Sequence, residues 1–231
     1  MAIADRLIDL RVRLGTGIAS LYLASRLLGR LSGGRADIEF HRLMVQPVRR
    51  GTVLPPRLRG SLTVRRLGAE EPEIASALSR AEDLGPRLAR GDGCLAAFRD
   101  GRLVGYLWLC FGVFEEPDSR CRFLLPAGPG AWDYDMFVAP DERGGPVFAA
   151  LWDAAWDLLR ERGIAWTASR ISGFNDLSLR SHARLGARPV GWLALLRLGA
   201  WQGYAGSLPP YAALSRGAGR PIVVKFRTAG N

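Results

Sequence analysis

The sequence predicts a mixed α/β fold of the α+β class, in which strands and helices alternate along one domain. Three observations support this prediction. From residue 61 onward, the spacing of apolar residues changes repeatedly between a period of two and a helical period. A chain of 231 residues with 48% hydrophobic and 23% charged residues can bury one sizeable core. No internal repeat or low-complexity tract interrupts the pattern.

Residues 1–60 are predicted to form a basic, amphipathic helical extension followed by a connector, and residues 61–231 the folded domain. Apolar residues recur at helical spacing within residues 4–31, which indicates one or two helices, broken near Gly15–Gly17. Residues 38–48 alternate as a strand. The apolar stripe of residues 4–31 has two readings, which are packing on the domain and peripheral contact with a membrane surface.

The net charge of +10 is concentrated near the N-terminus, because residues 1–60 carry 11 arginines against four acidic residues. This surplus indicates an anionic partner or a solvated, arginine-rich face. The composition supports the second explanation, since Lys225 is the single lysine of the chain. Nucleic acid is the least favoured partner, because no aromatic interleaving or recognition motif accompanies the charge.

The cysteines and histidines argue against a disulfide scaffold and against a metal site. Cys94, Cys110 and Cys121 are odd in number and form no closely spaced pair, which favours a reducing compartment. Only His41 and His182 are present, so no bound metal is expected. No run of 18 uncharged apolar residues predicts a spanning helix, and the first residues lack the order of a signal peptide. We therefore expect a cytoplasmic protein, with peripheral contact at the inner membrane surface left open.

The domain divides into strands and helices at clear turn signals. Strands are predicted over residues 62–67, 93–98, 103–111, 121–125, 132–138, 164–171, 189–198 and 221–227. Helices are predicted over residues 72–83, 146–162 and 175–185. Asp100-Gly101 is a strong hairpin signal between two of the strands. Residues 208–219 contain too much Pro and Gly for an assignment.

The segment 132–162 carries the first sign of chemistry. Its strand leads into a loop with Gly144 and Gly145, which let the backbone approach a ligand closely. The helix that follows begins with N–H groups that have no partner inside the helix, and its dipole favours an anion. The segment therefore predicts a phosphate site, with an ordinary strand–loop–helix connection as the alternative.

Two segments together resemble the GNAT family of acyl-CoA-dependent N-acyltransferases, in its bacterial type. The first reads DYDMFVAPDERGG over residues 133–145, and the second reads NDLSLRSHARLGA over residues 175–187. The hairpin over residues 93–112 looks like the second and third strands of this family. The resemblance covers about residues 61–199 and does not extend to residues 1–60.

The resemblance implies a twisted, mostly antiparallel sheet that splays apart at a central parallel pair, the strands over 132–138 and 164–171, with helices on both faces. It also implies acetyl-CoA, or another acyl-CoA, as a co-substrate lying in that split, with its pyrophosphate on the loop amides and its pantetheine paired to the strand backbone. The residues implied in co-substrate binding are Phe137, Val138, Arg143, Gly144, Gly145, Val147, Asn175 and Ser178.

One departure from the family pattern concerns the loop. Family members usually read Arg-Gly-x-Gly, whereas this chain reads Arg143-Gly144-Gly145-Pro146. Proline at a first helical position costs the helix nothing, but it removes one amide donor. Because a buried charge-assisted hydrogen bond contributes roughly 1.5–3 kcal/mol, weakened CoA binding and a degenerate site stay open.

Acyl transfer from a thioester needs an oxyanion donor, a base for the amine and an acid for the thiolate. The backbone N–H of Val138, freed where the sheet opens, is the candidate oxyanion donor. Strand alternation puts Asp133, Asp135 and Phe137 on one face, and either carboxylate could take the amine proton through water. The resemblance points to His182 as the general acid. The alternatives are solvated or ion-paired carboxylates and a capping histidine.

The sequence therefore predicts an N-acyltransferase that moves an acetyl or longer acyl group from acyl-CoA to an amine by direct attack in a ternary complex. A non-catalytic acyl-CoA-binding or regulatory protein of the same fold is the alternative. Aromatic residues near the predicted acceptor side hint at a small-molecule or glycan-like amine. An oligomer is left open.

Overall fold

The computed structural model describes residues 11–58, 60–79, 83–116, 119–217 and 219–226. Its chain forms two compact units whose segments alternate along the sequence. The first unit comprises Met1–Gln46, Val113–Pro126 and Ser169–Asn231. The second comprises Pro47–Gly112 and Ala127–Ala168.

The second unit is built on an antiparallel sheet in the spatial order β2 (Thr63–Leu67), β3 (Gly93–Arg99), β4 (Arg102–Cys110) and β7 (Gly130–Val138). The first residues of β8 (Trp166–Ser172) then pair with β7 in parallel. The helical elements of this unit are η1 (Pro56–Leu58), η2 (Pro72–Ser76), α3 (Leu84–Ala89), η4 (Pro140–Glu142) and α4 (Val147–Glu161).

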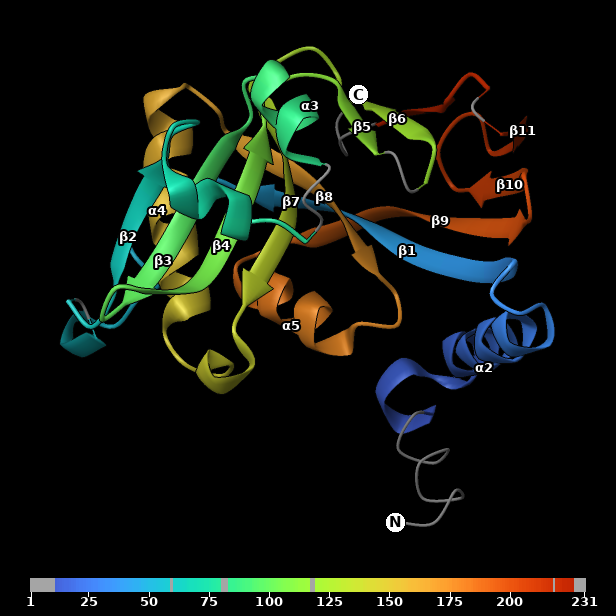
Figure 1. The fold of residues 1–231 in the computed structure, drawn as a ribbon, viewed down its shortest axis with the longest axis horizontal. Coiled ribbons are helices and arrows are strands. Elements are labelled where there is room, and N and C mark those ends of the chain that lie inside the picture. Colours follow the sequence, from blue (N-terminus) through green and yellow to red (C-terminus); the bar gives the residue numbers. More distant parts are fainter. Residues whose placement is uncertain (1–10, 59, 80–82, 117–118, 218, 227–231) are drawn as a thin grey trace. The chain divides into compact units, whose positions relative to one another are not determined.

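Helical segments cover both faces of this sheet, as Figure 1 shows for α4 and α3. On one face Gly105 of β4 lies so close to Val147 and Leu151 of α4 that a β-carbon would meet the Val147 side chain at 2.6 Å. On the other face the indole N–H of Trp108 donates to the carbonyl of Ala77, which follows η2. The predicted hairpin is confirmed, with Asp100 at φ 50° and Gly101 at φ 78°.

The predicted helix over residues 72–83 is wrong. The structure has the 3-10 turn η2 there, and the α-helix α3 starts only at Leu84. Backbone groups after η2 form hydrogen bonds with side chains of the sheet instead of with one another in a helix. The Ala77 carbonyl accepts from Trp108, and the Ser79 amide donates to the Asp135 carboxylate at 3.2 Å.

A β-bulge in β7 overturns the predicted alternation of Asp133, Asp135 and Phe137 on one face. Tyr134 pairs with Trp108 and Phe137 pairs with Tyr106, so one extra residue is inserted between these pairs. Asp135 has φ 47°, which marks the bulge. Phe137 therefore shares the face of Tyr134, and its ring stacks on Tyr106 at 5.3 Å.

The parallel pairing of β7 with β8 is short. It joins Gly130–Trp132 to Trp166–Ala168, although β7 continues to Val138 and β8 to Ser172. This is the central parallel pair that the fold prediction requires, within a mixed α/β sheet that is otherwise mostly antiparallel.

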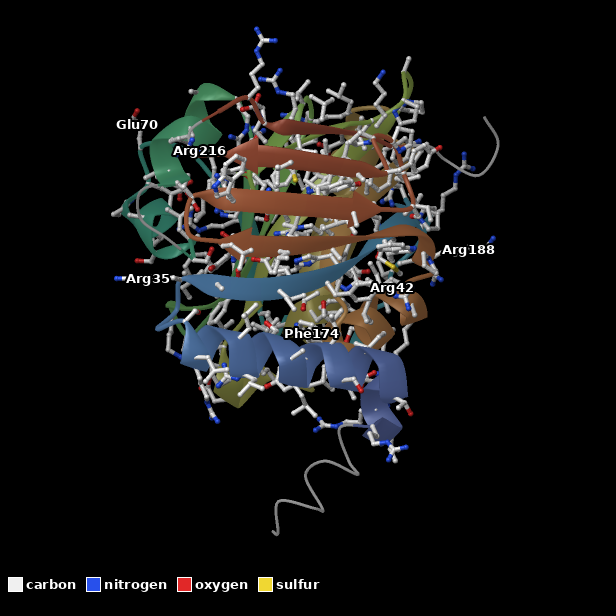
Figure 2. All side chains as sticks on the ribbon, turned by 90° about the vertical axis from the view of Figure 1, so that its right-hand side faces the viewer. Arg35, Arg42, Glu70, Phe174, Arg188 and Arg216 are labelled. Atoms are coloured by element: carbon white, nitrogen blue, oxygen red, sulfur yellow. The ribbon has the colours of Figure 1, made fainter. Side chains whose placement is uncertain are left out.

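The first unit carries four antiparallel strands in the order β11 (Ala212–Arg216), β10 (Trp201–Gly206), β9 (Arg188–Leu198) and β1 (Ala36–Pro47), followed by the end of β8. Figure 2 shows these four strands side by side, with α2 (Thr16–Leu31) lying along β1. The Ser25 hydroxyl bonds both the carbonyl and the amide of Ile38, so α2 caps an edge of β1. The unit also contains α5 (Asp176–Arg184).

A second, three-stranded sheet belongs to the same unit, in the order β12 (Ile222–Lys225), β6 (Cys121–Leu124) and β5 (Phe114–Glu116). It covers one face of the larger sheet, since the Gln202 amide donates to the Ser119 carbonyl and Arg170 pairs with Glu116. Leu193, Leu195 and Tyr204 are buried on that face.

The N-terminal predictions have three outcomes. The strand predicted over residues 38–48 is confirmed as β1, and it pairs with β9. The predicted break is found at Gly15, whose φ is 78° and which precedes α2. Residues 4–10 of the predicted helices lie outside the described residues. Because β1 belongs to the sheet of the first unit, the division at residue 60 stays a prediction.

Candidate functional site

The loop after β7 is held in one conformation by a 3-10 turn and an ion pair. After η4, Gly144 adopts φ 80°, a backbone conformation that side-chain-bearing residues rarely adopt. Arg99 of β3 donates to both carboxylate oxygens of Glu142, at 2.7 and 3.0 Å. The Gly145 amide donates to the Glu142 carbonyl at 3.1 Å. These bonds fix the loop at the entrance to α4.

The start of α4 presents the positive end of a 15-residue helix. The first internal hydrogen bond runs from the Ala150 amide to the Pro146 carbonyl at 2.9 Å, so helix geometry leaves the Val147 amide without an intrahelical acceptor. No side chain among the described residues caps this end, and its first turn has no acidic residue. An anion is therefore favoured there.

Two of the loop amides that were predicted to bind phosphate make hydrogen bonds within the loop. The Gly145 amide is engaged with Glu142, and the Arg143 amide approaches the Pro140 carbonyl at 3.5 Å. Pro146, which the sequence suggested as the first helical residue, is instead the N-cap, one position before α4 begins at Val147. Amides of Arg143, Gly144, Gly145 and Val147 were predicted to bind the pyrophosphate. Helix geometry supports that role most clearly for Val147.

At the end of β7, backbone amides point alternately toward β4 and away from it. The Ala139 amide donates to the Val104 carbonyl at 2.9 Å, so Val138 and Gly105 form a pair without mutual hydrogen bonds. The Val138 amide therefore points away from β4, as expected of an oxyanion donor. The same alternation directs the Phe137 amide toward Tyr106. Of Phe137 and Val138, only Val138 can therefore offer its backbone amide to a pantetheine that pairs like an added strand.

The two candidate carboxylates lie on opposite faces of β7. Asp133 is buried and pairs in register with Leu109. Asp135, after the bulge begins, forms an ion pair with Arg87 at 2.7 Å and accepts from the Ser79 amide. Proton abstraction by Asp135 would have to compete with both interactions. Asp135 is therefore an ion-paired carboxylate, the alternative that the sequence left open beside a general base.

A polar cluster around Tyr134 was missed by the sequence analysis. Its hydroxyl donates to Asp92 at 2.5 Å, and Arg90 pairs with the same carboxylate at 2.6 Å. The Arg87 guanidinium lies over the rings of Trp108 and Tyr134, at 4.8 and 4.9 Å. Burial, together with the charge of Asp92, raises the pKa of Tyr134, so it stays a neutral donor. No sequence motif signals this cluster, because α3 and the residues that follow it meet β4 and β7 only in the fold.

In the first unit, three predicted site residues form one hydrogen-bonded turn of α5. Asn175 is the N-cap, and its side-chain oxygen accepts from the Ser178 amide at 3.1 Å. His182 is buried, and its Nδ1 lies 2.8 Å from the Ser178 carbonyl. Because a carbonyl only accepts, Nδ1 carries a proton, and the neutral ring has its lone pair on Nε2. His182 can therefore donate from Nε2 only as an imidazolium.

A pocket of about 230 Å³ opens beside the start of α5. It is lined by Arg13, Leu14, Tyr22, Phe174, Asn175, Asp176 and Leu177. The ring of Phe174, labelled in Figure 2, meets that of Tyr22 edge-on at 5.3 Å. The N-terminal segment, which the resemblance does not reach, thus contributes to a cavity at Asn175.

The first unit contains a polar cluster of its own, between its two sheets. Glu39 and His41 of β1 are linked by a 2.8 Å contact between Oε2 and Nε2. Arg170 of β8 approaches Glu39 at 3.3 Å and also pairs with Glu116 of β5. Arg197 of β9 completes the cluster by pairing with Glu39 and Asp37. This ion network brings three carboxylates to two guanidinium groups.

The ion network shifts the pKa of two members. Burial alone would raise the pKa of Glu39, but the hydrogen bond from His41 and the charges of Arg170 and Arg197 hold it at about 2. Burial lowers the pKa of His41 against the opposing pull of Glu39, so the ring is neutral at pH 7. The buried Nδ1 of His41 has no hydrogen-bond partner among the described residues.

The chain belongs to the acetyltransferase (GNAT) family, because the model of that family matches residues 63–187, from β2 to α5. This confirms the resemblance seen in the two motifs. The match includes the loop before α4 and the Asn175–His182 turn. Comparison with curated proteins finds no match.

Solved structures share the fold at low sequence identity. A glucosamine N-acetyltransferase region of a fungal GH3 β-N-acetylglucosaminidase is 16% identical with a TM-score of 0.50, over 74% of this chain and 22% of that chain. A Drosophila protein is 17% identical with a TM-score of 0.48, over 71% and 52%. An aminoglycoside acetyltransferase from an uncultured soil metagenomic sample is 18% identical with a TM-score of 0.42, over 55% and 89%. The chain thus spans about half the length of the Drosophila protein.

The described residues offer neither a membrane-spanning helix nor a metal site. None of their helices is long and apolar enough to span a bilayer. They also contain no group of three or more His, Cys, Asp or Glu side chains arranged to hold a metal ion.

Proposed function

We propose that this protein is an N-acyltransferase that transfers an acetyl or longer acyl group from acyl-CoA to an amine by direct attack in a ternary complex. The observation that carries the proposal is the strand–loop–helix unit of β7, Gly144 and α4 in the family-matched segment. Its uncapped helix start, with the Val147 amide, fits a pyrophosphate. A thioester supplies an activated acyl carbon, so the protein has to orient it and manage charge and protons.

The roles of the chain's own residues follow from their geometry. The Val138 amide would donate to the oxyanion that forms during attack, and one such donor contributes about 10²–10³ in rate. His182, in its imidazolium form, would return a proton to the leaving thiolate through Nε2. Asp133 remains a candidate base, whereas the interactions of Asp135 make it the weaker one.

The ion network supports a cationic amine as the acceptor. Its carboxylates Asp37, Glu39 and Glu116 outnumber its guanidinium groups, and His41 is neutral at pH 7. A partly buried excess carboxylate is stabilised by an ammonium group. We therefore propose a small-molecule or glycan-like acceptor with a primary amine.

The alternative function, acyl-CoA binding without catalysis, keeps one supporting observation. Pro146 at the N-cap carries no N–H, so the loop offers one amide fewer to a diphosphate than the usual family sequence does. Weaker binding, or binding without turnover, is the expected signature of that reading.

Titration of acetyl-CoA by calorimetry, combined with a turnover assay on a panel of amines, tests the proposal. In Gly144→Glu, a carboxylate at the helix start and a strained backbone at φ 80° are expected to weaken acetyl-CoA binding by at least about tenfold. The matched control is Gly60→Glu, since Gly60 has φ 89° and equally open surroundings.

Three results separate the readings. Binding with turnover of at least one amine supports the acyltransferase. Binding without turnover on amino sugars, polyamines and peptide amines favours the non-catalytic protein. Absence of binding, or equal losses in the Gly144 and Gly60 variants, would overturn both.

A further inference from the structure

The outer face of the β1–β9–β10–β11 sheet is largely apolar. Cross-strand register aligns Ile38, Leu196, Gly203 and Leu214 in one row, and Ala36, Leu198, Trp201 and Arg216 in the next. Residues paired in register point to the same face of an antiparallel sheet. The opposite face is the one that β5, β6 and β12 cover. We call the rows and their neighbours the outer sheet face.

Large side chains on the outer sheet face are open to solvent. Leu214 is 67% exposed, Leu198 49%, Trp201 45% and Leu196 41%. Ala205 and Ala212 extend the surface on β10 and β11. Isolated exposed apolar residues are ordinary, but a contiguous patch of aligned strands marks a binding surface.

The charges around the outer sheet face have one sign. Each outward position of the four strands is apolar, glycine or arginine. Figure 2 looks onto this face and shows Arg35, Arg42, Arg188 and Arg216 spread around it. Among the described residues, the first unit carries 16 Arg and Lys against five Asp and Glu, whereas the second carries 12 against 13. The positive charge is therefore segregated into the unit that exposes the apolar face.

We propose that the outer sheet face docks peripherally on an anionic lipid surface. Leucine and tryptophan side chains would enter the interfacial region, and the arginines around them would contact lipid phosphates. A second copy of the chain fits less well, because pairing through this face would bring two strongly cationic units together. Nucleic acid fits less well too, because the centre of the face offers leucine and alanine instead of hydrogen-bond donors.

Helix α2 extends this surface along the edge of β1. Leu23, Leu27 and Leu31 are exposed and four residues apart, on the side opposite Ser25, which bonds to β1. The first turns of this segment add Arg11 and Arg13, and α2 itself contains no acidic residue. The membrane contact left open for residues 4–31 would then be one part of a larger surface.

Co-sedimentation of the full-length protein with vesicles tests this proposal. We expect binding to vesicles of phosphatidylcholine mixed with phosphatidylserine, weaker binding to phosphatidylcholine alone, and a decline with added salt. Leu196→Glu and Leu214→Glu should each lower partitioning about tenfold. The matched control is Leu177→Glu, because Leu177 is a 74% exposed leucine of α5 in the same unit. Circular dichroism checks that each variant folds.

Tryptophan fluorescence gives a second readout at the face itself. Brominated lipid in the anionic vesicles should quench emission of the wild-type protein, and Trp201→Phe should lose a measurable part of that quenching. The proposal is overturned if the wild type does not bind anionic vesicles, or if Leu177→Glu binds as poorly as the face variants. It is also overturned if Leu214→Glu splits a lipid-independent dimer.

Discussion

Glu39 and His41 show how two residues on one strand can set an electrostatic site. They are two positions apart, so β1 points both toward the same face, where burial strips water from them. Burial keeps the His41 ring neutral, whereas the hydrogen bond from His41 and the charges of Arg170 and Arg197 keep the Glu39 carboxylate ionised. Neither residue stands out in the sequence, since the partners come from β8 and β9.

Replacing Glu39 by Gln should remove pH-dependent stability. The folded pKa of Glu39 is about 2, below its usual 4.5, so the ionised form contributes stability that is complete above pH 4.5 and lost as the pH falls toward 2. The contribution is on the order of 2–3 kcal/mol at neutral pH. Urea unfolding of wild type and Glu39→Gln should differ most near pH 7 and converge near pH 2. A constant difference across this range would contradict the assignment.

His182 should matter for turnover and little for co-substrate binding. His182→Gln keeps a polar side chain in the buried position but removes the titratable ring, so turnover should fall about 10²-fold while acetyl-CoA affinity changes less than about twofold. Arg180→Gln, on the exposed side of the same helix, is the matched control. Equal turnover in wild type and His182→Gln would exclude the proton-transfer role.

At the scale of elements, the start of the β7–β8 pair depends on a glycine. A β-carbon at Gly130 would lie 2.4 Å from the Trp166 ring, so only glycine allows the two strands to approach there. The pair extends over just three residues of each strand before β7 and β8 part. The parallel pairing of the two strands therefore depends on a very short stretch that begins at this glycine.

Gly130→Ala should destabilise the fold by about 1–3 kcal/mol, because the ring or the strand must shift to admit a methyl group. Gly112→Ala is the control, since a β-carbon there meets nothing within 4 Å and Gly112 is not at positive φ. Chemical denaturation measures both. A loss in the control equal to that in Gly130→Ala would show that the Trp166 contact is not the cause.

Element prediction from the sequence succeeded where local signals were strong. The Asp100-Gly101 turn, the Gly163 stop after α4 and the Asn175 cap each act within a few residues, so their strands and helices were found. The bulge at Asp135 could not be predicted, because it depends on how β4 pairs with β7. For the same reason β10 and β11 were missed, since the pairing of β10 with β9 and of β11 with β10 overrides a Gly- and Pro-rich sequence.

At the scale of the whole molecule, the candidate site was predictable in part. The family motifs identified the loop before α4 and the Asn175–His182 turn from the sequence. The ion network was not predictable, because Glu39, Glu116, Arg170 and Arg197 come from four separate segments. The sequence located the surplus of residues 1–60, but not the way the fold groups it with other basic segments. The surplus extends beyond residues 1–60 to the whole first unit.

The three thiols should report on the two units separately. Burial raises the pKa of Cys94 to about 12 and those of Cys110 and Cys121 to about 11. At pH 8 all three should therefore resist iodoacetamide in the native protein and react in strong denaturant. Mass spectrometry across a urea series follows Cys121 in the first unit and the other two in the second. Rapid native alkylation of any of them would contradict the burial.

The pairing of β1 with β9 has a consequence for biosynthesis. Ala36 is matched to Leu198, so the ribosome must add about 160 residues between making one partner and the other, which takes roughly 8–30 s. During most of that time β1, one face of which is largely apolar, lacks both of its neighbouring strands. The nascent chain is thus expected to depend on a holding chaperone until β9 has been made.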